Sequence, residues 1–557
     1  MEINKIDILF CLFFIWHTVE VEVEVEVEVV IKMNSFECIS NRVVDVRVDA
    51  GMDIFNKFIE RSGMEKKSYQ YDGVKWLLQN ELMDVTSGSI RGGFVADEMG
   101  LGKTIMMIGL CLANFKHNRK TLIVLPPVLI EQWYAQIYRT TGHKCVVYHG
   151  ENKKNIDKKA AIADNHSDPF VDAVIVLCSY DAISIFREKT GKKNRNQSVS
   201  DANKQPKKLI ENSLLHRVKW SRVIFDEAHH LRNKNTSRYV GAKLLKADIK
   251  WLVTGTPVQN RKQDFYALCS LINLPASYYT NPDNYAEIVD TFILKRTKKL
   301  VGIDLEDAHH TKNIVAWKSE AELKFSQEIH SLIAFTNVKS PSSSNDNENN
   351  ILVVTKGLLP LLLKARQSCI YPKMVKTINS MNNGIGLVDQ NPTSNPTSTS
   401  KLDSVVGAIL ERKDNGNGKL VFCHFKEEMN EIADRLLNNG LNVGILDGKI
   451  TQVARRKLLG EKKDVLILQI QTGCEGLNLQ DNYSEIYFVS PHWNPYVEDQ
   501  AIARCHRIGQ KKPVFVWRFE MTGFDSIDNR NPIAKNLEEH VVDVQNAKRD
   551  VVKQINL

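Results

Sequence analysis

The segment Phe94–Thr104 has the residue types and spacing best suited to chemistry. It reads as a short apolar strand, a turn that contains Gly100 and Gly102, and a helix that begins at Lys103. Such a turn points backbone N–H groups at a phosphate, and the start of the helix adds partial positive charge. Lys103 supplies a point charge for terminal phosphates, and Thr104 a hydroxyl ligand for Mg²⁺. The segment therefore predicts phosphate binding, with an ordinary strand–turn–helix unit as the alternative.

Two adjacent carboxylates, Asp226 and Glu227, follow the apolar residues Val223–Phe225. This is the pattern of a buried strand that reaches the edge of a sheet. In that position Asp226 is predicted to hold Mg²⁺, and Glu227 to orient and deprotonate an attacking water. Paired carboxylates are also common at helix starts, where they interact favourably with the helix dipole. The catalytic interpretation is preferred because the pair follows the phosphate-binding turn at a distance of a few strand–helix units.

The elements that must position these residues are apolar strands that alternate with helix-like segments, a pattern typical of mostly parallel α/β sheets. A first block of predicted strands comprises Gly93–Ala96, Thr121–Leu125, Ala173–Cys178, Arg222–Phe225 and Lys250–Thr254. A second block comprises Leu420–Cys423, Val443–Leu446, Val465–Leu468, Ile486–Val489 and Val514–Phe519. The predicted fold class is thus α/β, with two tandem parallel-sheet lobes and a helical, partly disordered region between them.

Four regions follow from this pattern. Residues 1–50 are predicted to be a low-complexity extension, which includes a strict Val-Glu alternation from Val19 to Val29. Residues 51–275 form a first lobe that carries a polar, basic loop at 187–208, and residues 276–400 are a helical region with Ser/Asn/Pro-rich linkers. Residues 401–557 form a second lobe that ends in a charged helix.

The bulk composition is that of an ordinary globular protein, with 25% charged and 43% hydrophobic residues among 557. A net charge of +8 is compatible with a polyanionic partner without requiring one. The ten cysteines are scattered, and no pair has the spacing of a zinc site. The apolar run Ile8–Trp16 is too short to span a bilayer. We therefore expect no zinc, no membrane partner and a reducing compartment.

Several motifs occur in a consistent order along the chain. They are Tyr69-Gln70 with Gly73–Leu77, Asp97–Thr104, Leu122–Pro127 with Trp133, Ser179–Asp181, Asp226–His229, Thr254–Asn260, Leu294–Thr297, Arg366-Gln367, Gly476–Leu479, His492–Pro495 and Gln500–Gln510. This set resembles the Swi/Snf-type ATPases of helicase superfamily two. The second-lobe motifs most resemble the subgroup of helicase-like transcription factor and repair translocases, and the compact form is similar to viral global transactivators.

The resemblance implies that ATP and Mg²⁺ are the cofactors and that two RecA-like lobes act on them. Gln70 is expected to read adenine, and Gln500 to contribute from the second lobe. The phosphates are expected at Asp97, Glu98, Met99, Gly100, Leu101, Gly102, Lys103 and Thr104, and the metal at Thr104 and Asp226. Asp226, Glu227, Ala228 and His229 form the DEAH box. Because Gln500, Arg504 and Arg507 have the spacing of one helix face, the two arginines are expected to act as fingers on the γ-phosphate, each contributing about 10³–10⁵ in rate.

The resemblance also implies double-stranded DNA as the partner, bound through its phosphate backbone without separation of the strands. The residues assigned to coupling or to DNA are Thr254, Gly255, Thr256, Ser179, Trp133, Gly476, Asn478 and Trp493. The expected activity is that of a DNA-dependent ATPase that translocates on duplex DNA and remodels protein–DNA complexes, with chromatin or transcription proteins as further candidate partners. The expected location is the nucleus, or the site of viral DNA replication and transcription for a virus-encoded chain.

Two alternatives remain open from the residues. One is a strand-separating helicase or an RNA-dependent ATPase. The other is a non-catalytic DNA-binding regulator, against which stands the presence of Lys103, the acidic pair and both arginines. Three positions depart from the family pattern: Asp97 stands where the strict phosphate loop has glycine, Cys474 stands in a second-lobe motif, and Thr522–Asp525 replaces the usual tail sequence.

Overall fold

The computed structural model describes residues 36–83, 90–115, 120–162, 168–185, 214–257, 261–333, 359–375, 396–473, 476–524 and 535–554. The chain divides after Asp304 into two compact units, the first comprising Met1–Asp304 with Val552–Leu557 and the second Leu305–Val551. Each unit contains one sheet in which every strand pairing is parallel. The prediction of two tandem α/β lobes is therefore confirmed.

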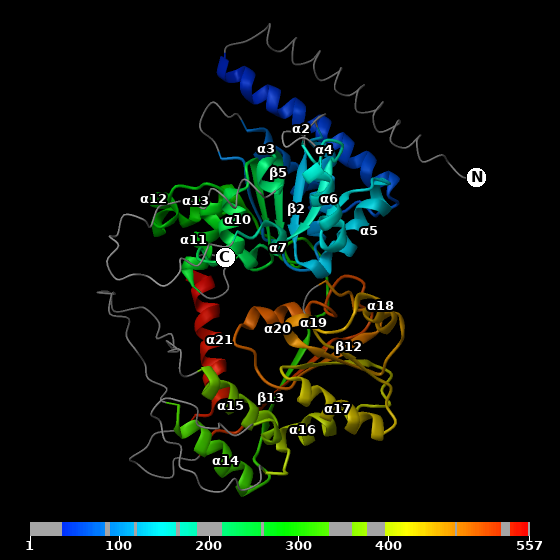
Figure 1. The fold of residues 1–557 in the computed structure, drawn as a ribbon, viewed down its shortest axis with the longest axis vertical. Helices are drawn as coiled ribbons and strands as arrows, with labels where there is room; N and C mark the ends of the chain where they lie inside the picture. Colours follow the sequence, from blue (N-terminus) through cyan, green and yellow to red (C-terminus); the bar gives the residue numbers. More distant parts are fainter. Residues whose placement is uncertain are drawn as a thin grey trace, which may run out of the picture. The chain divides into compact units, whose positions relative to one another are not determined.

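The first unit alternates strands and helices along the chain (Figure 1). Its strands are β1 (Gly92–Val95), β2 (Thr121–Leu125), β3 (Val146–Tyr148), β4 (Ile175–Ser179), β5 (Trp220–Asp226), β6 (Ala247–Val253) and β7 (Ile293–Leu294). Its helices are α2 (Phe36–Arg61), α3 (Ser68–Leu82), α4 (Lys103–Ala113), α5 (Ile130–Thr141), α6 (Gly150–Ile162), α7 (Tyr180–Ile183), α9 (Leu214–Arg217), α10 (Ser237–Leu244), α11 (Lys262–Leu271), α12 (Ala276–Tyr279) and α13 (Tyr285–Phe292), with 3₁₀ turns η2 (Pro127–Leu129), η4 (Ala228–Leu231) and η5 (Pro282–Asn284).

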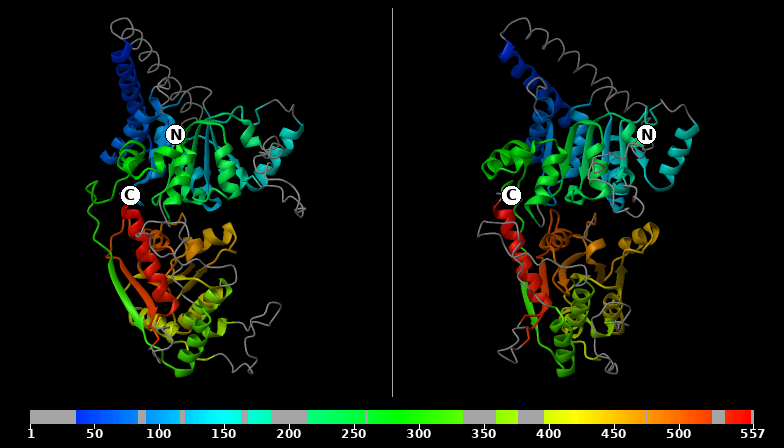
Figure 2. Two further views of the ribbon diagram at one scale, coloured as in Figure 1. Left: turned by 90° about the vertical axis from the view of Figure 1, so that its left-hand side faces the viewer. Right: turned by 60° about the vertical axis from the view of Figure 1, so that its left-hand side comes forward.

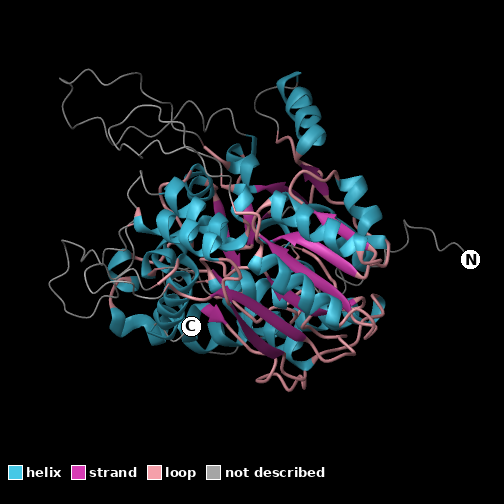
Figure 3. Cartoon of the chain, turned by 90° about the horizontal axis from the view of Figure 1, so that it is seen from below, coloured by secondary structure: helices cyan, strands magenta, loops and turns pink. Residues whose placement is uncertain are grey.

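The strand order in the first sheet is β3-β4-β2-β5-β6-β1-β7. Strands β2 and β4 are buried along their whole length, as expected when helices cover both faces of a parallel sheet. Figure 3, which colours the whole chain by secondary structure, shows helices lying around the strands. Val95 of β1 and Asp226 of β5 both pair with Val253 of β6, so these three strands end at the same level. The segments that follow them meet at one edge of the sheet.

One face of this sheet is covered by α2, α3, α4 and α5, whose apolar side chains form a single core with the strands. Residues 36–50, which the sequence assigned to a low-complexity extension, belong to α2, and Val48 and Met52 are buried in that core. The Val-Glu tract and the basic loop at 187–208 lie outside the described residues. Within the described part of the chain, no helix is both long and apolar enough to cross a membrane.

The second unit has the strand order β10-β11-β9-β12-β13-β8. Its strands are β8 (His309–Val315), β9 (Gly418–Cys423), β10 (Val443–Leu446), β11 (Val465–Gln469), β12 (Tyr483–Phe488) and β13 (Phe515–Met521). Its helices are α14 (Glu320–Ser331), α15 (Leu359–Ile370), α16 (Ser400–Glu411), α17 (Lys426–Asn438), α18 (Gln452–Gly460), α19 (Ile470–Gly473), α20 (Pro495–Ile502) and α21 (Leu537–Gln554), with the 3₁₀ turn η6 (Pro372–Met374).

Region 276–400, predicted to be helical, contributes one strand to each sheet, β7 to the first and β8 to the second. Strand β8 pairs along its full length with β13, although most of its side chains are exposed. An exposed edge strand needs no apolar run, and therefore the hydrophobic pattern gave no signal for it. The end of this region, where the sequence predicts a Ser/Asn/Pro-rich linker, also contacts the second unit, because the Ser398 hydroxyl donates to Glu322 of α14 at 2.9 Å.

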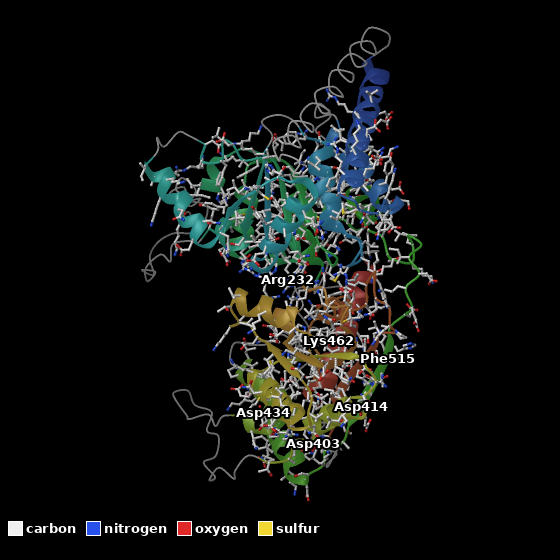
Figure 4. All side chains as sticks on the ribbon, turned by 90° about the vertical axis from the view of Figure 1, so that its right-hand side faces the viewer. Arg232, Asp403, Asp414, Asp434, Lys462 and Phe515 are labelled. Atoms are coloured by element: carbon white, nitrogen blue, oxygen red, sulfur yellow. The ribbon has the colours of Figure 1, made fainter. Side chains whose placement is uncertain are left out.

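The charged helix α21 is attached to the second unit by buried polar contacts. Lys401 of α16 donates to Glu538 of α21, and both side chains are almost completely buried. The same carboxylate accepts the backbone N–H of Met521 at 2.8 Å. Figure 2 shows α21 running beside the strands at this edge of the sheet. Asp403, labelled in Figure 4, ties α16 to α17 by accepting from Arg435 at 2.7 Å.

Candidate nucleotide-binding site and second-unit motifs

The phosphate-loop candidate occupies the turn between β1 and α4. Gly100 and Gly102 have φ of +95° and +81°, in the left-handed region that favours glycine. A Cβ built on Gly102 would lie 2.3 Å from Nε2 of Gln70, so a side chain at this position would displace the Gln70 amide. The first N–H groups of α4 have no partners within the helix, as at any helix start, and they follow directly on this turn.

The side chains predicted to bind the nucleotide contact the turn itself. Gln70 of α3 is buried, and its Nε2 donates to the carbonyl of Leu101 at 3.2 Å. Lys103 Nζ donates to the carbonyl of Asp97 at 2.7 Å and to that of Glu98 at 3.4 Å. The predicted adenine-reading residue and the predicted phosphate-binding lysine are thus brought to one loop.

Asp97, predicted among the cofactor-binding residues, turns its carboxylate into the protein. The side chain is fully buried and accepts two hydrogen bonds from Arg296, from Nε at 3.1 Å and from Nη2 at 2.6 Å. Glu98 likewise pairs with Lys298 at 2.7 Å. Both acidic residues therefore fasten the turn to the segment that follows β7. The sequence marks Arg296 as part of the motif Leu294–Thr297, but it does not indicate that Arg296 bonds to Asp97.

The acidic pair stands at the end of β5. Asp226 Oδ2 accepts the indole N–H of Trp133 at 2.7 Å, and its Oδ1 accepts the backbone N–H of Glu227 at 3.0 Å. The Asp226 carbonyl accepts the hydroxyl of Tyr180 at 2.7 Å. Glu227 has φ of +51°, one of two non-glycine residues with positive φ in the described part of the chain. Such strained backbone is concentrated at functional sites.

The donor set suits a magnesium ion. Each carboxylate oxygen of Asp226 accepts one hydrogen bond and keeps lone-pair capacity, and Thr104 adds a hydroxyl oxygen. Burial, together with the neighbouring charge of Glu227, raises the pKa of Asp226 to about 7. A bound cation would be favoured there because it offsets both effects.

The turn Thr254–Thr256 lies between the phosphate loop and the acidic pair, because it follows the strand between β1 and β5. Thr254 N–H donates to the carbonyl of Val95 at 3.1 Å, and a Cβ on Gly255 would lie 3.4 Å from the side chain of Met99. Thr256 N–H donates to the hydroxyl of Thr254 at 3.2 Å. The turn thus follows β6, the strand between β1 and β5, and contacts the phosphate loop directly.

Two residues assigned to coupling or to DNA are buried inside the first unit. The exposed fraction of Trp133 is 2% and that of Ser179 is 1%, and Ser179 Oγ lies 3.1 Å from Nδ1 of His149. In this conformation neither side chain is exposed to solvent, so the assignment of both residues to coupling or to DNA stays a prediction. The motif resemblance placed both residues in the right segments, but the direction of a side chain depends on the helix or strand end that carries it.

In the second unit, the prediction that one helix carries Gln500, Arg504 and Arg507 is wrong. Helix α20 begins with Asn494 as its cap and ends at Ile502, so that only Gln500 lies on it. Beyond it the N–H of Arg504 bonds to the carbonyl of Ala501 three residues back, and the Arg504 carbonyl accepts the N–H of Leu479 at 3.0 Å. A local turn and one tertiary bond thus take the place of a further helical turn, and the two arginines lie in the turns that follow.

The remaining second-unit motif residues are only partly brought together. Arg507 Nη1 donates to Oδ1 of Asn478, and Gly476 has φ of +70°. Burial, reinforced by the charge of Arg504, lowers the pKa of Arg507. Trp493 packs instead beside α21, and the guanidinium of Arg366 lies over its ring. Cys474 lies outside the described residues.

Comparison with known proteins agrees with this geometry. The model of the SNF2-related domain matches residues 69–382, more than half of the chain, and that of the helicase conserved C-terminal domain matches residues 400–509. The chain is 25% identical to the "Probable global transactivator" of Orgyia pseudotsugata multicapsid polyhedrosis virus, over 83% of this chain and 87% of that protein. It is 27% identical to "ATP-dependent DNA helicase DDM1" of Arabidopsis thaliana, over 86% of this chain and 62% of that protein.

Among solved structures, the Sulfolobus solfataricus SWI2/SNF2 ATPase core in complex with dsDNA is 20% identical, with a TM-score of 0.35, and the match covers 89% of this chain and 97% of that one. The chain spans most of the viral relative but less than two thirds of the plant protein. The SNF2-related domain and the helicase C-terminal domain together are those of ATP-hydrolysing enzymes. This chain therefore belongs to the SNF2-related family of helicase-type ATPases.

Proposed function

We propose that this protein is a DNA-dependent ATPase that translocates on double-stranded DNA and remodels protein–DNA complexes, in the nucleus or at a viral replication site. The observation that carries the proposal is the common level at which β1, β5 and β6 end. The phosphate loop, the acidic pair and the Thr254–Thr256 turn follow these three neighbouring strands. A conformational change in one of these segments can therefore alter the conformation of the other two.

The division of labour follows from residue chemistry. The N–H groups of the loop and Lys103 hold the phosphates of ATP, while Thr104 and Asp226 hold Mg²⁺, which neutralises charge on the phosphates. Glu227 orients and deprotonates the attacking water. Gln70 contacts the loop from α3, where it is available to the adenine. All of these residues belong to the first unit.

The second unit is proposed to supply Arg504 and Arg507 to the γ-phosphate. Each guanidinium would stabilise charge that develops in the transition state, a contribution of about 10³–10⁵ in rate for arginine fingers. The contact between Arg507 and Asn478 supports a shared role for the two second-unit motifs. DNA is proposed to bind through its phosphates, which carry little sequence information.

The test is ATP turnover measured without nucleic acid and with duplex DNA, single-stranded DNA or RNA. Duplex DNA is expected to raise the rate of the wild-type protein several-fold or more, and Lys103→Ala or Glu227→Gln to abolish turnover. Lys219→Ala is the matched control, because this lysine is exposed, pairs with Asp248 and precedes the opposite end of β5. Its turnover should equal that of the wild type.

Other outcomes would select the alternatives. Equal turnover with and without duplex DNA would contradict the proposal. Stimulation by RNA alone, or separation of a forked duplex, would indicate an RNA-dependent ATPase or a strand-separating helicase. Nucleotide binding without any turnover in the wild-type protein would indicate a non-catalytic regulator.

A further inference from the structure

Trp133 makes a hydrogen bond for which packing alone does not account. It lies on α5, and its indole N–H reaches Oδ2 of Asp226 at 2.7 Å. The sheet explains how they meet, because β2, which precedes α5, is the direct neighbour of β5. A residue of a segment assigned to DNA contact is thus bonded to the carboxylate proposed to hold the metal.

Other buried indoles in the first unit contact groups that have no part in the proposed reaction. The N–H of Trp220 donates to the carbonyl of Leu215 at 2.9 Å, and that of Trp251 to the buried carboxylate of Glu81 at 2.8 Å. Trp133 differs in that its acceptor is needed for the chemistry. Trp133 and Trp220 are nonetheless comparable in burial, with exposed fractions of 2% and 0%.

The contacts around Asp226 define its orientation completely. Trp133 restrains one carboxylate oxygen, and the N–H of Glu227 restrains the other. Tyr180, from the second segment assigned to DNA contact, holds the carbonyl that immediately precedes Glu227. The carboxylate and the left-handed backbone of Glu227 are therefore fixed from α5 and α7, outside their own strand.

We infer that Trp133 is a positioning residue for Asp226, which turns the free lone pairs of this carboxylate toward the metal that accompanies ATP. The inference rests on the proposed function for the identity of the metal–nucleotide ligand. Without the indole N–H, the carboxylate gains torsional freedom and its buried oxygen loses a donor. Part of the binding free energy of Mg²⁺ is then used to orient the carboxylate. A higher Mg²⁺ concentration is therefore needed for the same occupancy.

The experiment compares Trp133→Phe with Trp133→His. Phenylalanine removes the donor, whereas the five-membered ring of histidine overlays the pyrrole ring of tryptophan and can present an N–H at the same place. Binding of a fluorescent ATP analogue is measured without DNA, as a function of Mg²⁺ concentration. Loss of a hydrogen bond to a charged group corresponds to roughly a tenfold to hundredfold increase in the Mg²⁺ needed for half-maximal effect. Affinity without Mg²⁺ should stay within about twofold of the wild type, since Lys103 and the loop are unchanged.

The control is Trp220→Phe, which also deletes a buried indole and its hydrogen bond in the same unit. Both Phe variants should unfold at lower temperature, but only Trp133→Phe should shift the Mg²⁺ response, and Trp133→His should recover part of it. The inference fails if Trp133→Phe responds to Mg²⁺ like Trp220→Phe, or if histidine restores nothing. Because no DNA is present, this failure is distinct from a lack of stimulation by DNA, which would overturn the proposed function instead.

Discussion

At the scale of single residues, Gly102 constrains the phosphate loop both by its backbone conformation and by its closeness to Gln70. Gly102 combines a φ of +81° with a predicted distance of 2.3 Å from a new Cβ to Gln70 Nε2. The left-handed conformation alone costs about 1–2 kcal/mol for a residue with a side chain. The close approach of Gln70 adds a steric cost, because a new methyl group would push against the side chain expected to bind adenine.

Gly102→Ala is expected to weaken ATP binding by roughly tenfold to hundredfold, because overlap of this kind costs about 1–3 kcal/mol and displaces the loop or Gln70. The measurement is equilibrium nucleotide binding, with thermal unfolding in parallel. Gly142→Ala is the matched control, since it has φ of +70° at the end of α5 but no atom within 4 Å of a new Cβ. It should lose stability by about 1 kcal/mol and keep wild-type affinity. Equal affinities of the two variants would contradict the steric argument.

At the scale of elements, one contact that holds helix α21 to the second unit is a buried ion pair that no local sequence pattern indicates. Lys401 and Glu538 are separated by most of the second unit's sequence and are both buried. Lys401 also donates to the carbonyl of Phe519 at 3.3 Å. Helix α21 further contacts the segment that leads to the arginines, through Arg549 and Asp499 at 3.0 Å.

Lys401→Met is expected to destabilise the protein by about 3–5 kcal/mol, because it leaves the carboxylate of Glu538 buried without its partner. Lys401→Met combined with Glu538→Gln should recover most of this loss, since the amide is neutral and can still accept from Met521. Denaturant unfolding followed by tryptophan fluorescence measures both. Lys324→Ala, which removes an exposed ion pair with Glu320, should leave the unfolding transition close to that of the wild type, because solvent screens such pairs. The argument fails if Lys401→Met unfolds at the same denaturant concentration as Lys324→Ala.

At the scale of the whole molecule, the two units carry different chemistry. The first carries the lysine, the metal ligand and the proposed base, and the second carries the motifs that contain Asn478, Arg504 and Arg507. Neither unit has the complete proposed set. The proposed activity therefore requires the full chain. DNA is proposed to stimulate this activity by binding through its phosphates.

The concentration of duplex DNA needed for half-maximal stimulation is expected to rise at least about tenfold between roughly 50 and 200 mM salt, because bound phosphates exchange counterions for Lys and Arg. Two duplexes of unrelated sequence should give the same value. Turnover without DNA serves as the control and should depend much less on salt. A DNA requirement that is independent of salt, or that differs strongly between sequences, would contradict binding through the backbone.

The sequence was sufficient for the fold class and for the strands that lie in the middle of each sheet. Strand β2 has the bounds that its apolar run predicted, because a strand covered on both faces must be apolar throughout. Strand β8 escaped prediction since its exposed edge position imposes no such pattern. The phosphate loop and the acidic pair were recognisable because their chemistry requires particular residue types at adjacent positions.

The direction of side chains and the ends of helices were not encoded locally. Trp133 turns to Asp226, and Asp97 to Arg296, because the strand order brings together segments that are far apart in the chain. Helix α20 ends at Ile502, and the carbonyl of Arg504, which a further helical turn would use, accepts the N–H of Leu479 from a distant segment instead. Spacing along the chain thus determined which residues are available for chemistry. Which of them face one another depended on the packing of distant elements, whose contact energies no short stretch of sequence contains.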